Sequence, residues 1–299
     1  MTTARAIAAA VTAPVILASA LASAAGQRDA AAMDVVIASR SLRPGELVVF
    51  TISPVGEASG IEVMLFGRRA EGFRLADGRW RALVGIDLDQ KPGPYEAVIA
   101  ERRAADTVRT TRPVAVKPRT FPTRVLTVSP DFVNPSPAQL ERIAGESAFL
   151  KEIFSASAPR RLWAQSFTRP VPDPANSRFG TRSVFNGERR NPHGGADFLS
   201  PLGRPVRAPN AGRVVAARDL FFTGNVVVID HGIGMFSLLA HLSRIDVKEG
   251  DEVEAGEVLG LVGATGRVTG PHLHWALTVQ GARVDPVSLL VLLGEKEKE

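Results

Sequence analysis

The sequence contains no cysteine, which excludes disulfide bonds and thiolate chemistry. Any metal site must therefore draw its ligands from histidine, aspartate or glutamate. Histidine is also scarce: the 299 residues include five, and all five lie between residues 193 and 274. This grouping places the candidate functional site in the last part of the chain.

Long apolar runs are absent after the N-terminal segment, and residues 287–293 fall far short of the ~20 apolar residues that a membrane-spanning helix needs. Residues 1–24 combine an early Arg5, an alanine-rich apolar stretch and small residues up to Ala24, which is typical of a cleaved secretory signal. Pro14 and the modest apolarity of alanine argue against an uncleaved anchor. We therefore expect an exported protein without a stable membrane span, in the periplasm or alternatively secreted.

The chain carries a formal net charge of +5. This balance suits a protein beside an anionic surface such as a cell envelope. It would also suit non-specific binding of nucleic acid, but no motif of a nucleic-acid-binding module is present. We therefore expect no nucleic-acid partner.

Frequent glycine and proline (27 and 21 residues) indicate many turns and a mainly β protein. Short apolar segments with partial alternation recur between residues 34 and 118, separated by turn signals, and predict an immunoglobulin-like β-sandwich domain. The clearest of them are residues 47–52, 61–66, 80–84 and 95–99. Because this region has no histidine, we expect it to bind envelope partners, or to orient or restrain the other domain, rather than to carry the chemistry.

A connector over residues 119–164 contains one predicted helix, residues 137–154. Ser136 is the expected N-cap, Pro137 suits the first helical position, and Gln139 completes a capping box. Apolar residues then recur at helical spacing until Pro159 ends the pattern. We interpret this helix as a packing or spacer element.

Residues 165–293 are β-rich again and form the predicted C-terminal domain, followed by a charged tail at 294–299. His272 and His274 flank one residue, so on a strand both imidazoles project from the same face. His193 and Asp197 form an HxxxD pattern that two glycines keep out of a helix, and His241 ends another apolar run. Each motif is weak alone. With His and Asp donors, a metal site would favour zinc with three protein ligands and one open position.

A series of motifs in order, over roughly residues 178–290, resembles the lysostaphin/LytM-type zinc endopeptidases. The motifs are FGTR (179–182), HGGAD (193–197), GNVVVIDHG (224–232), AHL (240–242), VKEGDEV (247–253), GATG (263–266) and GPHLHW (270–275). The resemblance implies a C-terminal antiparallel β metallopeptidase domain of the duplicated hybrid motif type. It also implies hydrolysis of peptide cross-links or stem peptides of bacterial peptidoglycan by a metal-activated water.

The resemblance assigns roles residue by residue. His193, Asp197 and His274 match the ligands of one zinc ion per chain. His272 and His241 match the two catalytic histidines, of which we expect His272 to be the general base and His241 to support it.

Two positions depart from the family pattern. Many members have tyrosine where this chain has Leu239, and many have glutamate where it has Ala276. Neither position is a ligand, so we expect effects on rate or substrate fit. His231, in an Asp-His-Gly turn, is expected to be structural.

Three alternatives are open from the sequence, and the third, a sugar-binding sandwich whose histidines are unrelated surface residues, is remote because the histidines occupy every expected motif position. The chain could be an inactive relative that regulates other cell-wall hydrolases, although all five motif positions are present. Residues 247–263 also have the glycine-rich pattern of lipoyl or biotinyl carrier domains, but the turn at 263–266 lacks the lysine that attachment requires.

Overall fold

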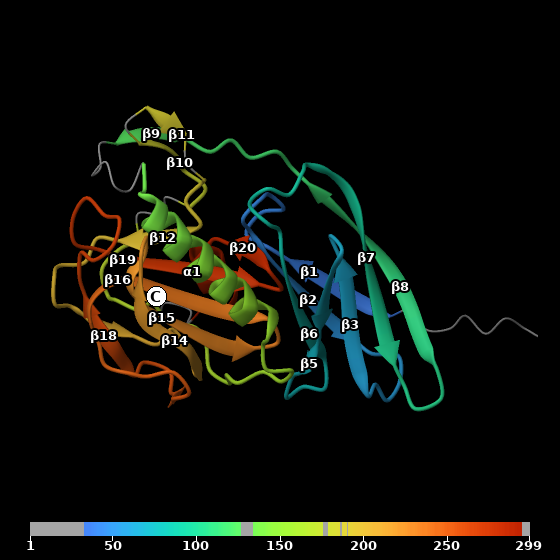
Figure 1. Cartoon of the computed structure of the whole chain (residues 1–299). Coiled ribbons are helices and arrows are strands. Elements are labelled where there is room, and N and C mark those ends of the chain that lie inside the picture. Colours follow the sequence, from blue (N-terminus) through green and yellow to red (C-terminus); the bar gives the residue numbers. More distant parts are fainter. Residues whose placement is uncertain (1–32, 127–133, 176–178, 186, 190, 295–299) are drawn as a thin grey trace, which may run out of the picture. The chain divides into compact units, whose positions relative to one another are not determined.

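The computed structural model describes residues 33–126, 134–175, 179–185, 187–189 and 191–294. The predicted signal segment and tail residues 295–299 lie outside the described residues. Within the described part of the chain, no helix is both long and apolar enough to cross a membrane. Antiparallel strands dominate the structure, which confirms the prediction of a mainly β protein (Figure 1).

The N-terminal strands form two four-stranded antiparallel sheets. The first sheet has the order β1 (Asp34–Ala38), β2 (Leu47–Ser53), β6 (Trp80–Gly85) and β5 (Phe73–Arg74). The second has the order β4 (Arg68–Glu71), β3 (Gly60–Leu65), β7 (Gly93–Arg102) and β8 (Thr107–Val116). Between them lies one buried apolar cluster that includes Ile52, Val63, Val84 and Ile99. Alternation along each strand supplies these inward-facing side chains.

A nine-stranded sheet forms the C-terminal part. Its main order is β12 (Gly195–Phe198), β19 (Leu273–Val279), β16 (Met235–Ile245), β15 (Gly224–Gly232), β14 (Gly212–Leu220) and β17 (Glu252–Val253). Three further strands, β13 (Pro205–Arg207), β18 (Val258–Val262) and β20 (Ala282–Val284), pair outside this path. A separate small sheet joins β11 (Glu188–Arg189), β10 (Arg182–Phe185) and β9 (Thr123–Leu126). The main sheet places residues from distant motifs on neighbouring strands.

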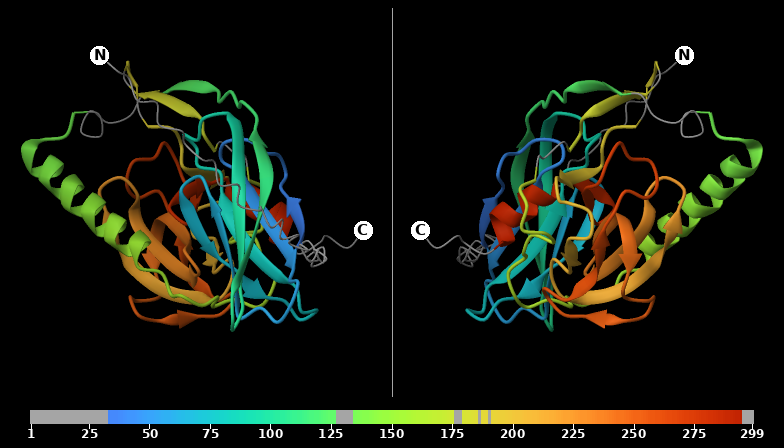
Figure 2. Two further views of the ribbon diagram at one scale, coloured as in Figure 1. Left: turned by 90° about the vertical axis from the view of Figure 1, so that its right-hand side faces the viewer. Right: turned by 90° about the vertical axis from the view of Figure 1, so that its left-hand side faces the viewer.

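Helix α1 spans Pro137–Ser155. Its capping box is present, because the Ser136 hydroxyl accepts from the Gln139 backbone and the Gln139 side chain accepts from the Ser136 backbone. The helix lies along β14–β16 (Figures 1 and 2), and its partly buried apolar residues, among them Phe149 and Phe154, pack on that face of the sheet. No α1 residue is fully buried, so the helix covers the sheet from outside.

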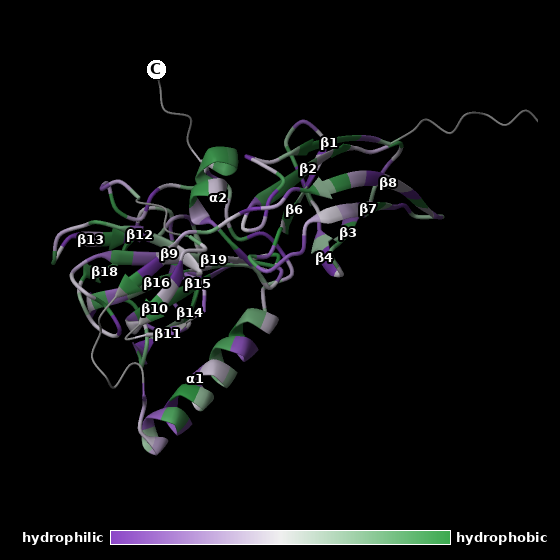
Figure 3. Cartoon of the chain, turned by 90° about the horizontal axis from the view of Figure 1, so that it is seen from above, coloured by the Kyte–Doolittle hydropathy of each residue, from purple (hydrophilic) through white to green (hydrophobic). Residues whose placement is uncertain are grey.

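Helix α2 (Pro286–Leu293) is mostly apolar, and one end of it is strongly hydrophobic (Figure 3). Asp285 caps it by accepting a hydrogen bond from the Val287 backbone N–H at 3.1 Å. Leu289 and Leu293 are buried in the C-terminal core. The apolar segment that is too short for a membrane span is therefore a core helix.

The sandwich and the C-terminal sheet share part of one core. Leu47, Val49 and Leu83 belong to the same buried cluster as the strands of the C-terminal sheet. Beside this cluster, the Arg40 guanidinium contacts the carboxylates of Glu46 and Asp285, each at 2.7 Å. The predicted division into a sandwich domain and a C-terminal domain remains a prediction.

We expect Arg40→Ala to lower the free energy of unfolding by about 3 kcal/mol, because it leaves two carboxylates buried with fewer partners. Glu46 and Asp285 side chains are 3% and 0% exposed. Urea unfolding followed by tryptophan fluorescence measures the change. Arg43→Ala is the matched control, since Arg43 is exposed; equal stability of the two variants would contradict the prediction.

Candidate metal centre

The pairing of β12 with β19 brings a carboxylate and an imidazole together. Asp197 lies directly opposite His274 in the antiparallel register. His274 Nδ1 is 3.0 Å from Asp197 Oδ1, and His193 Nε2 is 3.0 Å from both of these atoms. Three donor atoms from the HxxxD and HxH motifs therefore form a triangle with equal sides.

This triangle has the chemistry and the size of a metal site. Ligands at about 2.0–2.1 Å around a tetrahedral zinc ion would be ~3.3 Å apart, close to the observed 3.0 Å. Among the described residues, the potential metal ligands that lie close together are the side chains of His193, Asp197 and His274. The donor set thus fits one zinc ion.

Protonation in this group follows from burial and proximity. Burial raises the pKa of the Asp197 carboxyl, but hydrogen bonds from His193 and His274 outweigh this effect and hold the pKa far below its usual range. Burial lowers the pKa of His274, against the attraction of Asp197. The group therefore contains an ionised carboxylate, which is the form that binds a metal.

Gly195 allows β12 to approach β19 this closely. A Cβ atom at Gly195 would lie 2.5 Å from the Trp275 carbonyl oxygen and 2.7 Å from His274 Cε1. The neighbouring Gly194 has nothing within 4 Å of such an atom. The two glycines of HGGAD therefore differ, and one of them determines where His274 lies.

Two further imidazoles lie beside the triangle. His272 Nε2 is 3.8 Å from Asp197 Oδ1, and the His241 ring lies 4.9 Å from that of His272 and 5.8 Å from that of His274. The structure therefore brings together all five residues that the sequence predicts for the site. His272 and His274 do project to the same side.

Backbone carbonyls orient both of these rings. His272 Nδ1 donates to the Gly270 carbonyl at 2.8 Å, and His241 Nδ1 donates to the Thr265 carbonyl at 2.9 Å. Since a carbonyl only accepts, each Nδ1 carries hydrogen, and Nε2 is the ring nitrogen left for proton transfer or substrate contact. Burial lowers the pKa of His241 to about 3, with smaller contributions from His274 and His272. The sequence did not indicate these two carbonyls.

A β-bulge turns His241 toward the group. In a regular strand His241 would share a face with Leu239, whose side chain is buried in the core. The register between β15 and β16 shifts at this point, His241 adopts φ of 66°, and Leu242 takes the next core position. An extra residue in a bulge re-aims the following side chains. Leu239 accordingly points away from the metal-binding group, whereas Ala276 follows His274 on its own face.

His231 is separate from this group and fully buried. Its Nδ1 donates to the Ala211 carbonyl at 2.8 Å, and its Nε2 accepts from the Ser237 hydroxyl at 2.9 Å. Trp275 Nε1 donates to the same hydroxyl at 3.1 Å. Both ring nitrogens are satisfied, which agrees with the expected structural role.

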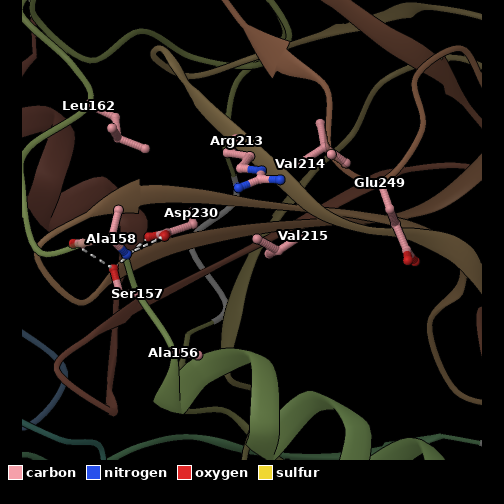
Figure 4. Close-up of a pocket in the computed structure, with 10 residues that line it drawn as sticks. Ala156, Ser157, Ala158, Leu162, Arg213, Val214, Val215, Asp230 and Glu249 are labelled. Atoms are coloured by element: carbon pink, nitrogen blue, oxygen red, sulfur yellow. Dashed lines mark hydrogen bonds between the residues drawn. The ribbon is translucent and has the colours of Figure 1, made fainter.

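A cavity of about 450 Å³ lies near the end of α1 (Figure 4). Ten residues line it, and none belongs to the metal-binding group. Its buried carboxylate, Asp230, accepts from the Ser157 hydroxyl at 2.6 Å and from the Ala158 N–H at 2.7 Å. These bonds attach the connector to β15, so we interpret this region as structural.

Comparison with known proteins matches the region that contains the metal-binding group. The family model for peptidase family M23 matches residues 191–286. Peptidoglycan DD-endopeptidase ShyA of Vibrio cholerae is 43% identical over 119 residues, covering 38% of this chain and 28% of that protein. DD-carboxypeptidase/endopeptidase Mpg of Neisseria meningitidis is 45% identical over 97 residues, covering 32% and 22%. This chain thus spans about a quarter of the length of these curated relatives.

Among solved structures, a Pseudomonas aeruginosa protein assigned to peptidase M23 is similar over most of both chains. Its sequence is 34% identical, its TM-score is 0.66, and the match covers 85% of this chain and 96% of that chain. The match therefore extends well beyond the segment that contains the metal-binding group.

We expect Gly195→Ala to weaken zinc binding by about 10–100-fold, because its methyl group would displace His274 from Asp197. Competition with a chromophoric chelator measures the dissociation constant. Gly194→Ala is the matched control and should bind zinc like the wild type. Equal affinity of the two variants would show that Gly195 does not position the ligand.

We expect His231 to make the stability of the protein depend on pH. Burial lowers the pKa of His231 from 6.5 to about 4. Below pH 6.5 the unfolded chain binds a proton that the folded chain does not, so stability falls with pH until about pH 4, by up to about 3 kcal/mol. Urea unfolding of the wild type and His231→Gln from pH 7 to 4 tests this, and parallel pH profiles would refute it.

Proposed function

The chain belongs to peptidase family M23, and from this premise we propose that it is a zinc-dependent endopeptidase of bacterial peptidoglycan. Its substrates would be peptide cross-links or stem peptides of the cell wall. The observation that supports this best is the convergence of His193, Asp197 and His274, with His272 and His241 beside them.

His193 Nε2, Asp197 Oδ1 and His274 Nδ1 would hold the zinc ion. When bound, zinc would polarise the scissile carbonyl and lower the pKa of water, so that water could act as a nucleophile at neutral pH. Three protein ligands are the number that is usual in catalytic zinc sites, and such a set would leave room for water or substrate. Asp197 contributes one negative charge, which would lower the net charge of the ion and its ligands together.

His272 is the general base of this proposal. Its Nδ1 donates to the Gly270 carbonyl, so its Nε2 faces the site, 3.8 Å from the Asp197 carboxylate. An adjacent negative charge stabilises the imidazolium that forms when Nε2 accepts a proton from the attacking water. The same atom then returns the proton to the leaving amine.

His241 supports this step. It is more buried than His272, and burial disfavours its charged form. Its Nε2 therefore acts as a neutral acceptor that orients the attacking water or the substrate. The Thr265 carbonyl fixes the ring in the tautomer that this role requires.

The proposed substrate follows from the relatives. The matched Vibrio cholerae protein is named a peptidoglycan DD-endopeptidase, and the matched Neisseria meningitidis protein is named a DD-carboxypeptidase/endopeptidase. The formal charge of +5 and the signal-like residues 1–24 agree with export to the periplasm, or with secretion. Residues 34–118 would then contact envelope partners while residues 165–293 act on the wall.

We expect the purified zinc-loaded protein to release new amino termini from cross-linked peptidoglycan dimers. Mass spectrometry of the digest identifies the cleaved bond. A chelator and His193→Ala should each abolish cleavage, and His272→Ala should lower kcat by ~10²–10⁴-fold without loss of zinc. Intact dimers with the zinc-loaded wild type would instead favour the inactive relative that regulates other cell-wall hydrolases.

A further inference from the structure

Helix α1 is bonded to the tip of the β14–β15 hairpin. Glu146 Oε2 accepts a hydrogen bond from the Phe221 backbone N–H at 2.8 Å. Its other oxygen accepts from Arg142 Nε at 2.6 Å, and the same guanidinium donates to Asp219 at 2.7 Å. The Glu146 side chain is 17% exposed, so the carboxylate is enclosed between the helix and the hairpin.

The hairpin tip consists of three residues, and each is held by a different element. Glu146 binds the N–H of Phe221, and the carbonyl of Phe222 accepts from the Arg267 N–H at 2.9 Å. The carbonyl of Thr223 accepts from the His241 N–H, also at 2.9 Å. The backbone that α1 holds therefore contacts the backbone of His241 two residues later.

His241 needs such external support. Its φ of 66° lies in the left-handed region, which is unfavourable for a residue with a side chain. Conformations of this kind persist where surrounding contacts over-determine them. The Thr265 carbonyl orients the imidazole ring, whereas the Thr223 carbonyl holds the backbone of the bulge.

We propose that Glu146 is a positioning residue for His241, acting through the backbone of residues 221–223. The inference rests on the proposed function, because it assumes that His241 takes part in hydrolysis. It gives α1 a role in the site beyond that of a spacer. The helix would hold the bulged strand in the conformation that points Nε2 at the substrate.

The structure distinguishes this role from general stabilisation. Apolar residues of α1, including Phe149 and Phe154, pack on the sheet independently of the carboxylate. Loss of Glu146 would therefore leave the helix docked while releasing the Phe221 N–H. A small displacement of a catalytic group lowers turnover far more than it lowers substrate binding or zinc binding.

The test uses Glu146→Ala, Glu146→Gln and the matched control Glu141→Ala, an exposed position on the same helix. We expect Glu146→Ala to lower kcat on cross-linked peptidoglycan fragments by about 10-fold, with KM and zinc content unchanged. Glu146→Gln should restore most of kcat, because its amide oxygen still accepts from Phe221. Glu141→Ala should match the wild type.

Hydrogen exchange gives a readout that does not depend on activity. The amides of Phe221 and His241 should exchange faster in Glu146→Ala than in Glu141→Ala, while the rest of β16 is unchanged. Full kcat or unchanged exchange in Glu146→Ala would overturn the inference, as would an equal loss in Glu146→Gln. An inactive wild type or an active His241→Ala would overturn the proposed function, and exchange would still decide whether Glu146 holds the His241 backbone.

Discussion

The antiparallel pairing of β12 with β19 is the constraint on which the site depends. It places Asp197 opposite His274, and the preceding loop returns His193 to the same point. Backbone hydrogen bonds maintain this register for Asp197 and His274, and the backbone of His193 is held separately by bonds to Gly180 and Thr181. Gly195 makes the close approach of the two strands possible.

Burial and backbone carbonyls together set the protonation of the surrounding groups. Asp197 is held ionised by its imidazole partners, although burial acts in the opposite direction. His241 and His272 each donate from Nδ1 to a carbonyl, which leaves Nε2 as an acceptor. The site thus combines one fixed negative charge with two imidazoles that present Nε2, a combination that suits binding of a dication and transfer of a proton.

Much of the architecture was predictable, because it follows from local chemistry. Alternating residues indicated the strands of the N-terminal sheets, and Ser136, Pro137 and Gln139 indicated the start of α1. The HxH spacing predicted that His272 and His274 share one side, since strands have a period of two. The shared core of the N-terminal and C-terminal sheets was not predictable, because residues such as Leu47 and Leu83 have no sequence signal that identifies their distant partners.

The sequence by itself determined which residue types were available: five histidines in one region, one HxxxD pattern and no cysteine. Tertiary structure alone decided how they face one another. His241 is the clearest case. Alternation along β16 would place its side chain in the core with Leu239, but a bulge turns the side chain to the opposite face of the sheet. Contacts between distant segments, such as the bond from Phe221 to Glu146, arise only when hydrogen bonding and packing of the whole sheet set the register.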